Sequence, residues 1–189
     1  MAPLDLHEQE RQLNDLAKEF EVLRARVGDL SYTPGVDALR RIGPLLYQVQ
    51  DLTAVVLVRL NALHNSSHTG VTYGRSSLKC LSSVVVAASL VSNALARTLH
   101  ANPDESMPFP GRRMEDAPAR IARQAKAILL MNGYLDEAAR QLELCARGCR
   151  FAATHVARNR TATQARRTEF AQSKSGPRPP VPGMTRSSP

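Results

Sequence analysis

The chain has 189 residues and a formal net charge of +8, with 43% hydrophobic residues, 4% aromatic residues and no Trp. This length suffices for one ordinary domain whose core consists mostly of Leu, Val and Ala. The longest uncharged run, residues 80–96, is short for a membrane span and holds several polar side chains, so we expect no membrane partner.

Two further features bear on the cellular context. Arg outnumbers Lys by 21 to 4, a bias that fits a GC-rich bacterial genome. Charged side chains occupy the first thirty residues in place of an apolar signal peptide, and the three cysteines form no paired framework. We therefore expect a cytoplasmic protein.

The first helical stripe occupies the first thirty residues. Its apolar residues recur in steps of three and four, which places them on one face of a helix, and Gln9 fills one vacant position of that seam. The stripe ends at residues 31–35, Ser-Tyr-Thr-Pro-Gly, which is a turn signal. Its members are Leu6, Leu13, Leu16, Phe20, Leu23, Val27 and Leu30.

A second stripe follows, with Thr53 in one seam position. Gly43 and Pro44 lie inside it, and Pro lacks a backbone donor. We therefore expect either a kink or a short helix that restarts with Pro44 in its first turn. Residues 65–75, with Gly70 and Gly74, are expected to form a polar loop. The stripe comprises Leu39, Ile42, Leu46, Val49, Val56, Leu60 and Leu63.

The third stripe has no acidic residue, and Val84, Val86, Leu90 and Val91 widen its apolar face beyond one seam. We expect this helix to be the most buried one or to contribute to an oligomer interface. The stripe comprises Leu78, Leu81, Val85, Ala88, Ser92, Leu95 and Leu99.

The fourth stripe is the longest and follows a Pro-rich loop over residues 101–117. Asp116 is expected to cap the helix, with Pro118 in its first turn. The apolar pattern stops after Arg158, and from Ser173 the composition turns to Pro, Arg, Ser and Gly. The stripe comprises Ile121, Ile128, Met131, Leu135, Ala138, Leu142, Cys145, Cys149, Ala152 and Val156.

Four helices with modest connections predict an all-α protein, an antiparallel four-helix bundle with up-down-up-down order. Residues 1–158 are assigned to the bundle and residues 159–189 to a basic, disordered tail that cannot bury enough apolar surface to order. Residues 1–30 carry a net charge of −3 and residues 151–189 a net charge of +6. An acidic first helix is therefore expected beside a basic fourth helix.

The basic residues of the fourth helix and tail raise the possibility of nucleic-acid binding, because phosphate recognition uses many such charges. Stacking aromatics and DNA-binding motifs are missing, so the plainer interpretation is a solvated helix face followed by a solubilising tail. The candidate phosphate contacts are Arg147, Arg150, Arg158, Arg160, Arg166, Arg167 and Lys174.

One constellation suggests a metal site. In an up-down-up-down bundle, the topology gathers His64, His68, Cys80, Cys145 and Cys149 at a similar height, and mixed imidazole and thiolate ligands suit zinc. Both the His pair and the Cys145/Cys149 pair have the i,i+4 spacing of one helix face. The plainer interpretation is that both helix-four cysteines fill seam positions where small buried residues belong.

Enzyme signatures are missing from the sequence: it has no Gly-rich phosphate loop, no His-Glu-x-x-His and no Glu-x-x-His. We expect neither catalytic residues nor a cofactor. The leading hypothesis is a non-enzymatic interaction or assembly module. In it, a protein partner or a second copy docks on the third helix or the first-helix stripe. The alternatives are a nucleic-acid-binding protein and a zinc-containing bundle.

Overall fold

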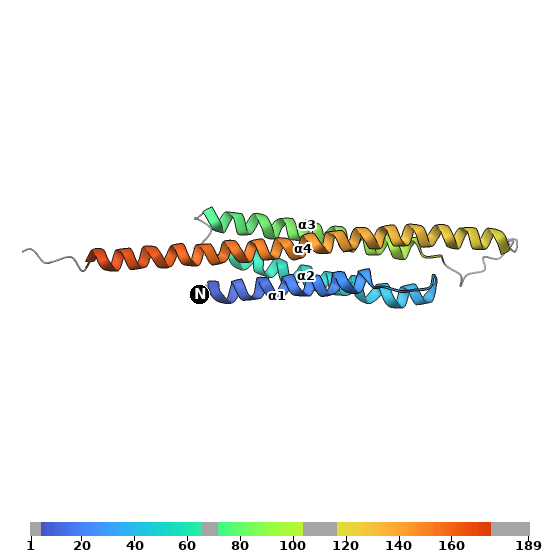
Figure 1. The fold of residues 1–189 in the computed structure, drawn as a ribbon, viewed down its shortest axis with the longest axis horizontal. Coiled ribbons are helices and arrows are strands. Elements are labelled where there is room, and N and C mark those ends of the chain that lie inside the picture. Colours follow the sequence, from blue (N-terminus) through green and yellow to red (C-terminus); the bar gives the residue numbers. More distant parts are fainter. Residues whose placement is uncertain (1–4, 66–71, 104–116, 175–189) are drawn as a thin grey trace, which may run out of the picture.

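The computed structural model describes residues 5–65, 72–103 and 117–174, and these contain four helices and no strand. The longest helix, α4, has 58 residues, which is about 87 Å of helix at 1.5 Å per residue. Figure 1 shows that it runs past both ends of the other helices. The helices are α1 Leu6–Gly28, α2 Val36–His64, α3 Thr72–Ala101 and α4 Ala117–Lys174.

The four helices alternate in direction along the long axis of the molecule (Figure 1), which confirms the predicted antiparallel four-helix bundle. The central element is α4, which packs against both α1 and α3. Helix α2 packs on α3, whereas α1 and α2 touch only lightly. The bundle is therefore closed on the α4 side and comparatively open between α1 and α2.

Three ion pairs join α1 to α4, and they confirm that the acidic first helix lies beside the basic fourth. As residue numbers rise along α1 they fall along α4, so the pairs report one antiparallel register. Surface ion pairs contribute at most about 1 kcal/mol each, so their main effect is to select this register. The nitrogen–oxygen distances are 3.2 Å for Arg160–Glu10, 2.5 Å for Arg150–Glu21 and 3.9 Å for Arg24–Glu143.

The stripe predicted in the first thirty residues is the buried face of α1, and Gln9 is buried with it. Asp5 caps the helix by accepting hydrogen bonds from the backbone N–H groups of His7 and Glu8. The seam of α4 is likewise buried from Met131 to Val156. Ile121 and Ile128 of the predicted stripe are exposed, because they lie toward the end of α4 that extends beyond the other helices (Figure 1).

The predicted stripe of α2 is rotated relative to the observed core. Leu39 is 50% exposed and Leu46 and Leu60 are only partly buried, whereas Ala38 and Leu45 are in the core. Both sets have helical spacing, so the sequence period alone does not choose between them. The buried residues of α2 are Ala38, Ile42, Leu45, Val49, Leu52, Val56 and Leu63.

Helix α2 does not restart at Pro44 but continues through it from Val36 to His64. Proline removes one intrahelical donor and leaves the carbonyl four residues earlier, at Arg40, without its usual partner. Arg40 is exposed, so water can satisfy that carbonyl. Ile42 and Leu45, on either side of Pro44, are both buried in the core, so packing supports the helix across the proline.

Helix α3 begins at Thr72, so residues 72–75 of the predicted loop over residues 65–75 are helical instead. Its core face centres on Leu81, Val84, Ala88, Val91 and Leu95, while Leu78, Val85 and Leu99 of the predicted stripe are partly buried. Serine and threonine hydroxyls along α3 donate to the carbonyl four residues earlier, which explains how an apolar helix accommodates them. These hydroxyls belong to Ser82, Ser83, Ser89, Ser92 and Thr98.

The predicted tail needs a correction at its start, because α4 continues to Lys174 and residues 159–174 are helical. Helix propagation needs no new nucleus once a packed segment exists, and no Gly or Pro lies between Gly148 and Gly176. The side chains from Thr161 onward are exposed or only partly buried where described. Asp116, the predicted cap of α4, and residues 175–189 lie outside the described residues.

The turn between α1 and α2 is tied to α3. Gly35, with a φ of 101°, adopts a conformation that L side chains rarely reach. The side chain of Asn102 makes two hydrogen bonds to the backbone of Gly35. Its Oδ1 accepts from Gly35 N at 2.7 Å, and its Nδ2 donates to Gly35 O at 2.8 Å. Tyr32 OH donates to Asn132 Oδ1 at 2.7 Å, so α4 also anchors this turn.

Removing the Asn102 side chain tests this anchor. Asn102→Ala deletes both bonds to Gly35, and we expect the free energy of unfolding to fall by about 1–3 kcal/mol. Asn102→Asp keeps the acceptor and loses the donor, so its loss should be smaller. Asn93→Ala, an exposed change on α3, which ends at the residue before Asn102, should stay within about 0.5 kcal/mol. Urea denaturation gives all three values, and equal losses for Asn93→Ala and Asn102→Ala would contradict the anchor.

Gly148 permits a close approach of α4 to α3. A Cβ atom built at Gly148 would lie 2.5 Å from Cγ2 of Val84 and 3.7 Å from the carbonyl oxygen of Cys80. Valine has one strongly preferred rotamer in a helix, so its methyl group cannot easily move aside. At Gly133, also on α4, nothing lies within 4 Å of such a Cβ.

The same Gly→Ala change on one helix should therefore have opposite signs at these positions. Gly133→Ala should raise the free energy of unfolding by about 1 kcal/mol through helix propensity. Gly148→Ala gains the same propensity, but overpacking against Val84 costs about 1–3 kcal/mol, so we expect a net loss or no gain. Chemical denaturation measures both. A second change, Val84→Ala, should shrink the Gly148→Ala penalty, and equal stabilisation at both glycines would refute the close approach.

Candidate protein-docking groove

A groove with a volume of about 430 Å³ runs along the outer face of the α3–α4 pair. Its walls carry exposed apolar side chains, from Val86 and Leu90 on α3 and from Leu144 and Phe151 on α4. Leu144 and Phe151 are seven residues apart and so project on one side of α4. The remaining lining comes from Cys80, Ser83, Val84, Ala87, Gln141, Arg147 and Gly148.

The groove is shallow-walled but has a fixed floor. Gly148 contributes no side chain, and Val84 and Ala87 beside it are buried in the α3–α4 contact. The part of α4 from Gln141 to Phe151 spans about 15 Å, which is close to three helical turns. The floor is therefore a packed, rigid surface of the length that a short helix covers.

On the side of the groove that is nearer the start of α4, Arg97 of α3 contacts Tyr134 of α4. Arg97 Nη2 donates to Tyr134 OH at 3.0 Å, and its guanidinium carbon lies 4.4 Å from the centre of the Tyr134 ring. Such a cation–π contact holds both side chains in place. This pair bridges α3 and α4, and each member is seven residues from the nearest groove residue of its helix, Leu90 or Gln141.

The charge around the groove is predominantly positive. Helix α3 contains no Asp or Glu, and it carries Arg75, Lys79 and Arg97. Arg147 on α4 lines the groove itself, and no ion pair involves it among the described residues. Glu143, the acid nearest along α4, forms an ion pair with Arg24 of α1 at 3.9 Å. Glu137 accepts hydrogen bonds from Gln141 and Arg140, which hold the pKa of its carboxyl below the usual value.

Sequence reasoning found half of this groove. The widened apolar face of α3 indicated Val86 and Leu90, and both are exposed at the groove. Leu144 and Phe151 were missed because each stands one position before a member of the core stripe, Cys145 and Ala152. Their i,i+7 spacing is the signal that marks a second apolar face.

The first-helix stripe does not serve as a docking surface, because its residues are buried within the chain's own bundle. Leu13, Phe20 and Leu23 are fully buried, and Val22 is the large exposed hydrophobic residue of α1. The hypothesis of docking through that stripe is therefore wrong. Of the two surfaces proposed from sequence, the third helix remains.

The predicted metal ligands are only partly brought together. Cys145 Sγ lies 3.7 Å from the carbonyl oxygen of Val84, one turn from Cys80, and Cys149 is on the same face of α4. His64 is exposed at the last turn of α2, and His68 lies outside the described residues. Within residues 5–65, 72–103 and 117–174, no group of three or more His, Cys, Asp or Glu side chains is arranged to hold a metal ion.

All three cysteines are free thiols. Burial raises the pKa of Cys145 to about 12, with a further contribution from the neighbouring Cys149, and burial also raises the pKa of Cys149 to about 12. Cys80 is half-buried, and burial raises its pKa as well, while Lys79 acts in the opposite direction. The two helix-four cysteines are thus protonated residues of the core at neutral pH.

The candidate phosphate contacts divide into two groups. Arg150 and Arg160 face α1 and form ion pairs with Glu21 and Glu10, and Arg160 also contacts His7 Nδ1 at 2.6 Å. Arg147, Arg158 and Arg166 are exposed on other faces of α4. The side chains of Arg167 and Lys174 lie outside the described part of the chain. The predicted basic stripe is therefore not one continuous surface.

One described segment, Gly74–Ala101 in α3, is long and apolar enough to cross a membrane by length and composition alone. In the structure, the face carrying Leu81, Val84 and Leu95 is buried within the bundle. Core helices pass the same compositional test.

Comparison of the chain with protein-family models, with curated proteins and with solved structures finds no significant match. The case for the groove therefore depends on its geometry and charge.

Deprotonation of the buried thiols predicts a loss of stability at alkaline pH. A folded-state pKa near 12 lies above the unfolded value of 9.0, so the contribution is fully present below pH 9 and is lost as the pH rises toward 12. Each pKa unit corresponds to about 1.4 kcal/mol. Cys145→Ala with Cys149→Ala should therefore give a shallower decline of unfolding free energy between pH 9 and 11.

Cys80→Ala is the matched control, because the Cys80 thiol is only half-buried. Cys80→Ala should leave the decline of unfolding free energy between pH 9 and 11 close to that of the unmodified chain, since the two proteins differ in no other titratable group. Urea denaturation at several pH values measures the slopes. Identical slopes for the double variant and for the unmodified chain would contradict the burial of these thiols.

Proposed function

We propose that this protein is a non-enzymatic docking module whose α3–α4 groove binds an amphipathic helix of another protein. The observation that carries the proposal is the set of four exposed apolar side chains, Val86, Leu90, Leu144 and Phe151, gathered over a rigid floor. Exposed apolar surface of this kind is costly in water unless a partner covers it.

The length and shape of the groove favour a helical partner. A helix laid into such a groove presents apolar residues at positions i, i+3 or i+4, and i+7, which matches about 15 Å of contact. Phe151 and Leu144 supply the large contact area that typically dominates the energetics of an interface.

The charge around the groove selects the partner's chemistry. Arg147 lines the groove, Lys79 and Arg97 belong to the α3 segments just before and after its lining residues, and α3 has no acidic side chain. A helix with Glu or Asp flanking its apolar face complements these cations, whereas a basic helix is repelled. The partner is therefore an acidic amphipathic helix.

The same charge disfavours a second copy of the chain on this face. A two-fold dimer would place the groove against itself and bring Arg147 of one protomer toward the cations of the other. The acidic surface of the chain is on α1, and α1 exposes a single large apolar residue, Val22. It therefore offers no apolar stripe to fill the groove.

A set of designed helical peptides tests the proposal directly. The peptides share one three-heptad apolar stripe and differ only in the flanking residues, which are Glu, Gln or Lys. Fluorescence anisotropy should show binding in the order Glu, Gln, Lys, and added salt should narrow the difference. Val86→Glu should lower the affinity for the Glu-flanked peptide at least tenfold, because it places an unpaired charge in the apolar contact.

The matched control is Val58→Glu, because Val58 is 60% exposed on α2 and Val86 is 62% exposed in the groove. It should leave binding unchanged. Arg147→Glu should lower the affinity for the Glu-flanked peptide and raise the affinity for the Lys-flanked peptide. Equal effects of the Val58 and Val86 variants would reject the groove as the binding site. If the unmodified chain forms a concentration-dependent dimer and Val86→Glu makes it monomeric, the groove is instead an interface between two copies of the chain.

A photo-reactive amino acid at position 86 then identifies the natural partner in a cell extract, with position 58 as the control site. A protein crosslinked from position 86 alone must contain an acidic amphipathic helix at the crosslink. A crosslinked segment without such a helix would overturn the proposed partner chemistry.

A further inference from the structure

The face of α2 that points away from the bundle carries a second row of residues with helical spacing. Its members recur in steps of four and three residues, which is the spacing of a helix–helix contact. Each member except Asp51 stands two positions before a buried residue of α2, which places it about 200° around the helix from the core. We call this row the outer seam of α2, and it comprises Val36, Arg40, Gly43, Tyr47, Asp51 and Ala54.

The outer seam presents apolar surface to solvent. Tyr47 is 71% exposed, Val36 is 58% exposed, and Leu39 beside the seam is 50% exposed. Gly43 leaves open space in the same row, because a Cβ atom built there would meet nothing within 4 Å. A row of exposed apolar side chains on one helix face is typical of a contact surface.

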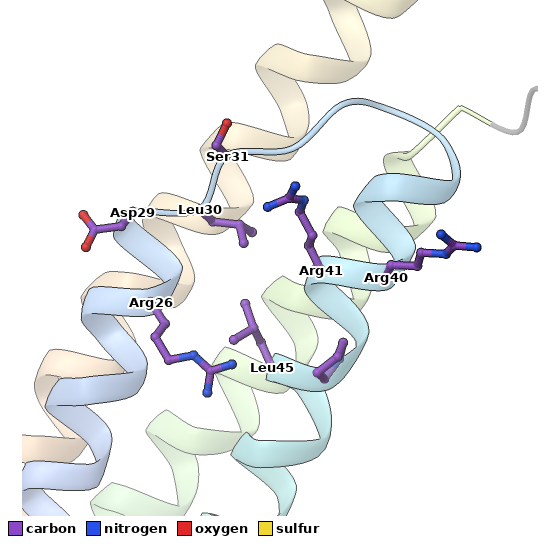
Figure 2. Close-up of a pocket in the computed structure, with 8 residues that line it drawn as sticks. Arg26, Asp29, Leu30, Ser31, Arg40, Arg41 and Leu45 are labelled. Carbon is purple, nitrogen blue, oxygen red and sulfur yellow. The ribbon is translucent and has the colours of Figure 1, made fainter.

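The two charged members of the outer seam are not paired within the chain. Arg40 and Asp51 are exposed, and neither side chain forms an ion pair or a hydrogen bond with another described residue. In Figure 2, Arg40 extends away from α1 and from the hollow of about 390 Å³ that lies between α1 and α2. The two residues stand about 16 Å apart along the helix, which is too far for them to pair with each other.

The order of residues along the outer seam is complementary to the same order in reverse. An antiparallel pair of α2 helices, related by a two-fold axis near position 45, makes each facing pair twice. Val36 then faces Ala54 of the second copy, Gly43 faces Tyr47, and Arg40 faces Asp51. The next register along the seam would place Asp51 against Val36 and leave its carboxylate without a cation.

We propose that the outer seam of α2 is the interface of an antiparallel homodimer. Tyr47 of each copy packs into the open space at Gly43 of the other copy, and Arg40 of each copy pairs with Asp51 of the other. Ion pairs of this kind select the register and the partner more than they add affinity. No member of the outer seam lines the α3–α4 groove, so the dimer does not depend on the docking function.

The size and charge of the outer seam fit a dimer that dissociates on dilution. At about 100 Å² for each large side chain, Val36, Leu39, Tyr47 and the stem of Arg40 contribute on the order of 400 to 500 Å² from each copy. Two copies then bury about 1,000 Å², which is at the low end of specific interfaces. Helix α2 carries three Arg and two Asp residues, so two copies are not strongly repelled, in contrast to two copies of the basic groove.

Charge reversal tests the proposed pairing. Arg40→Asp and Asp51→Arg should each weaken the dimer at least tenfold, because like charges then face each other twice. An equal mixture of the two variants should form a heterodimer, since one chain supplies two acids and the other supplies two bases. Sedimentation velocity over a range of concentrations measures all three samples.

A mixture that stays as monomeric as its separate components would overturn the register, and so would an unmodified chain that is monomeric at every concentration. Because both variants are exposed changes and the mixture restores association, loss of folding cannot imitate the expected result.

Tyr47→Glu should also weaken the dimer at least tenfold, because it places a charge against Gly43 of the second copy. Val22→Glu is the matched control, since Val22 is 53% exposed on α1, and it should leave the dimer intact. Val86→Glu should likewise leave the dimer intact while it disrupts peptide binding in the groove, so the two proposals can fail separately. A dimer that survives Tyr47→Glu would refute the outer seam as the interface.

Discussion

The close approach of α4 to α3 is the constraint on which the rest of the bundle depends. Small residues at this contact, above all Gly148 and Ala88, let the two backbones come together until Val84 fills the space where a side chain of α4 would stand. Dispersion contacts summed over such a surface are large, whereas single contacts are small. Helix α4 then supports α1 on its other side, and α2 is held through α3.

The contact between α4 and α1 has a different chemistry. Leu13, Phe20 and Leu23 are large and fully buried, so this contact depends on apolar area more than on close backbone approach. Surface ion pairs then distinguish the native antiparallel register from its neighbours. Buried Gln9 and Asn159 add polar groups near the same end of the pair, and Gln9 Oε1 has no hydrogen-bond partner. Such buried polar groups cost stability, and in helical bundles they help to specify register.

The sequence was sufficient for the number, order and direction of the helices, because hydrophobic period and turn residues are local signals. The sequence was less informative about which face of each helix is turned toward the core. Leu39 and Ala38 are adjacent and both fit a helical stripe, and only the position of α3 decides that Ala38 is buried and Leu39 is not. The end of α4 was misplaced for a related reason. Loss of apolar period marks the end of packing, whereas the helix continues to Lys174, and the next Gly or Pro after Gly148 is Gly176.

The candidate surfaces were the least predictable features, because each one depends on how the helices pack. Val86 is visible as surplus apolar surface on α3, but Leu144 becomes part of a groove only when α4 lies beside α3 in one register. The outer seam of α2 has the same helical spacing as the buried face, and only the packed bundle shows that Tyr47 is on the exposed one. The predicted cysteine cluster shows the converse. Topology did place Cys145 against the carbonyl of Val84, one turn from Cys80, yet Cys145 is a buried core residue whose pKa is raised by burial.

The two hollows of the bundle arise from opposite kinds of packing. Between α3 and α4 the helices are so close that a missing side chain at Gly148 lowers the surface, and the groove floor is the core itself. Between α1 and α2 the helices are held apart, and the space between them is bridged by long side chains such as Arg26. A floor made of packed core cannot deform without cost, so the surface above it keeps one shape. The space between α1 and α2 is bridged by exposed side chains, which can change rotamer without disturbing the core. The difference between the two helix pairs follows from where the chain places a glycine and where it places its arginines.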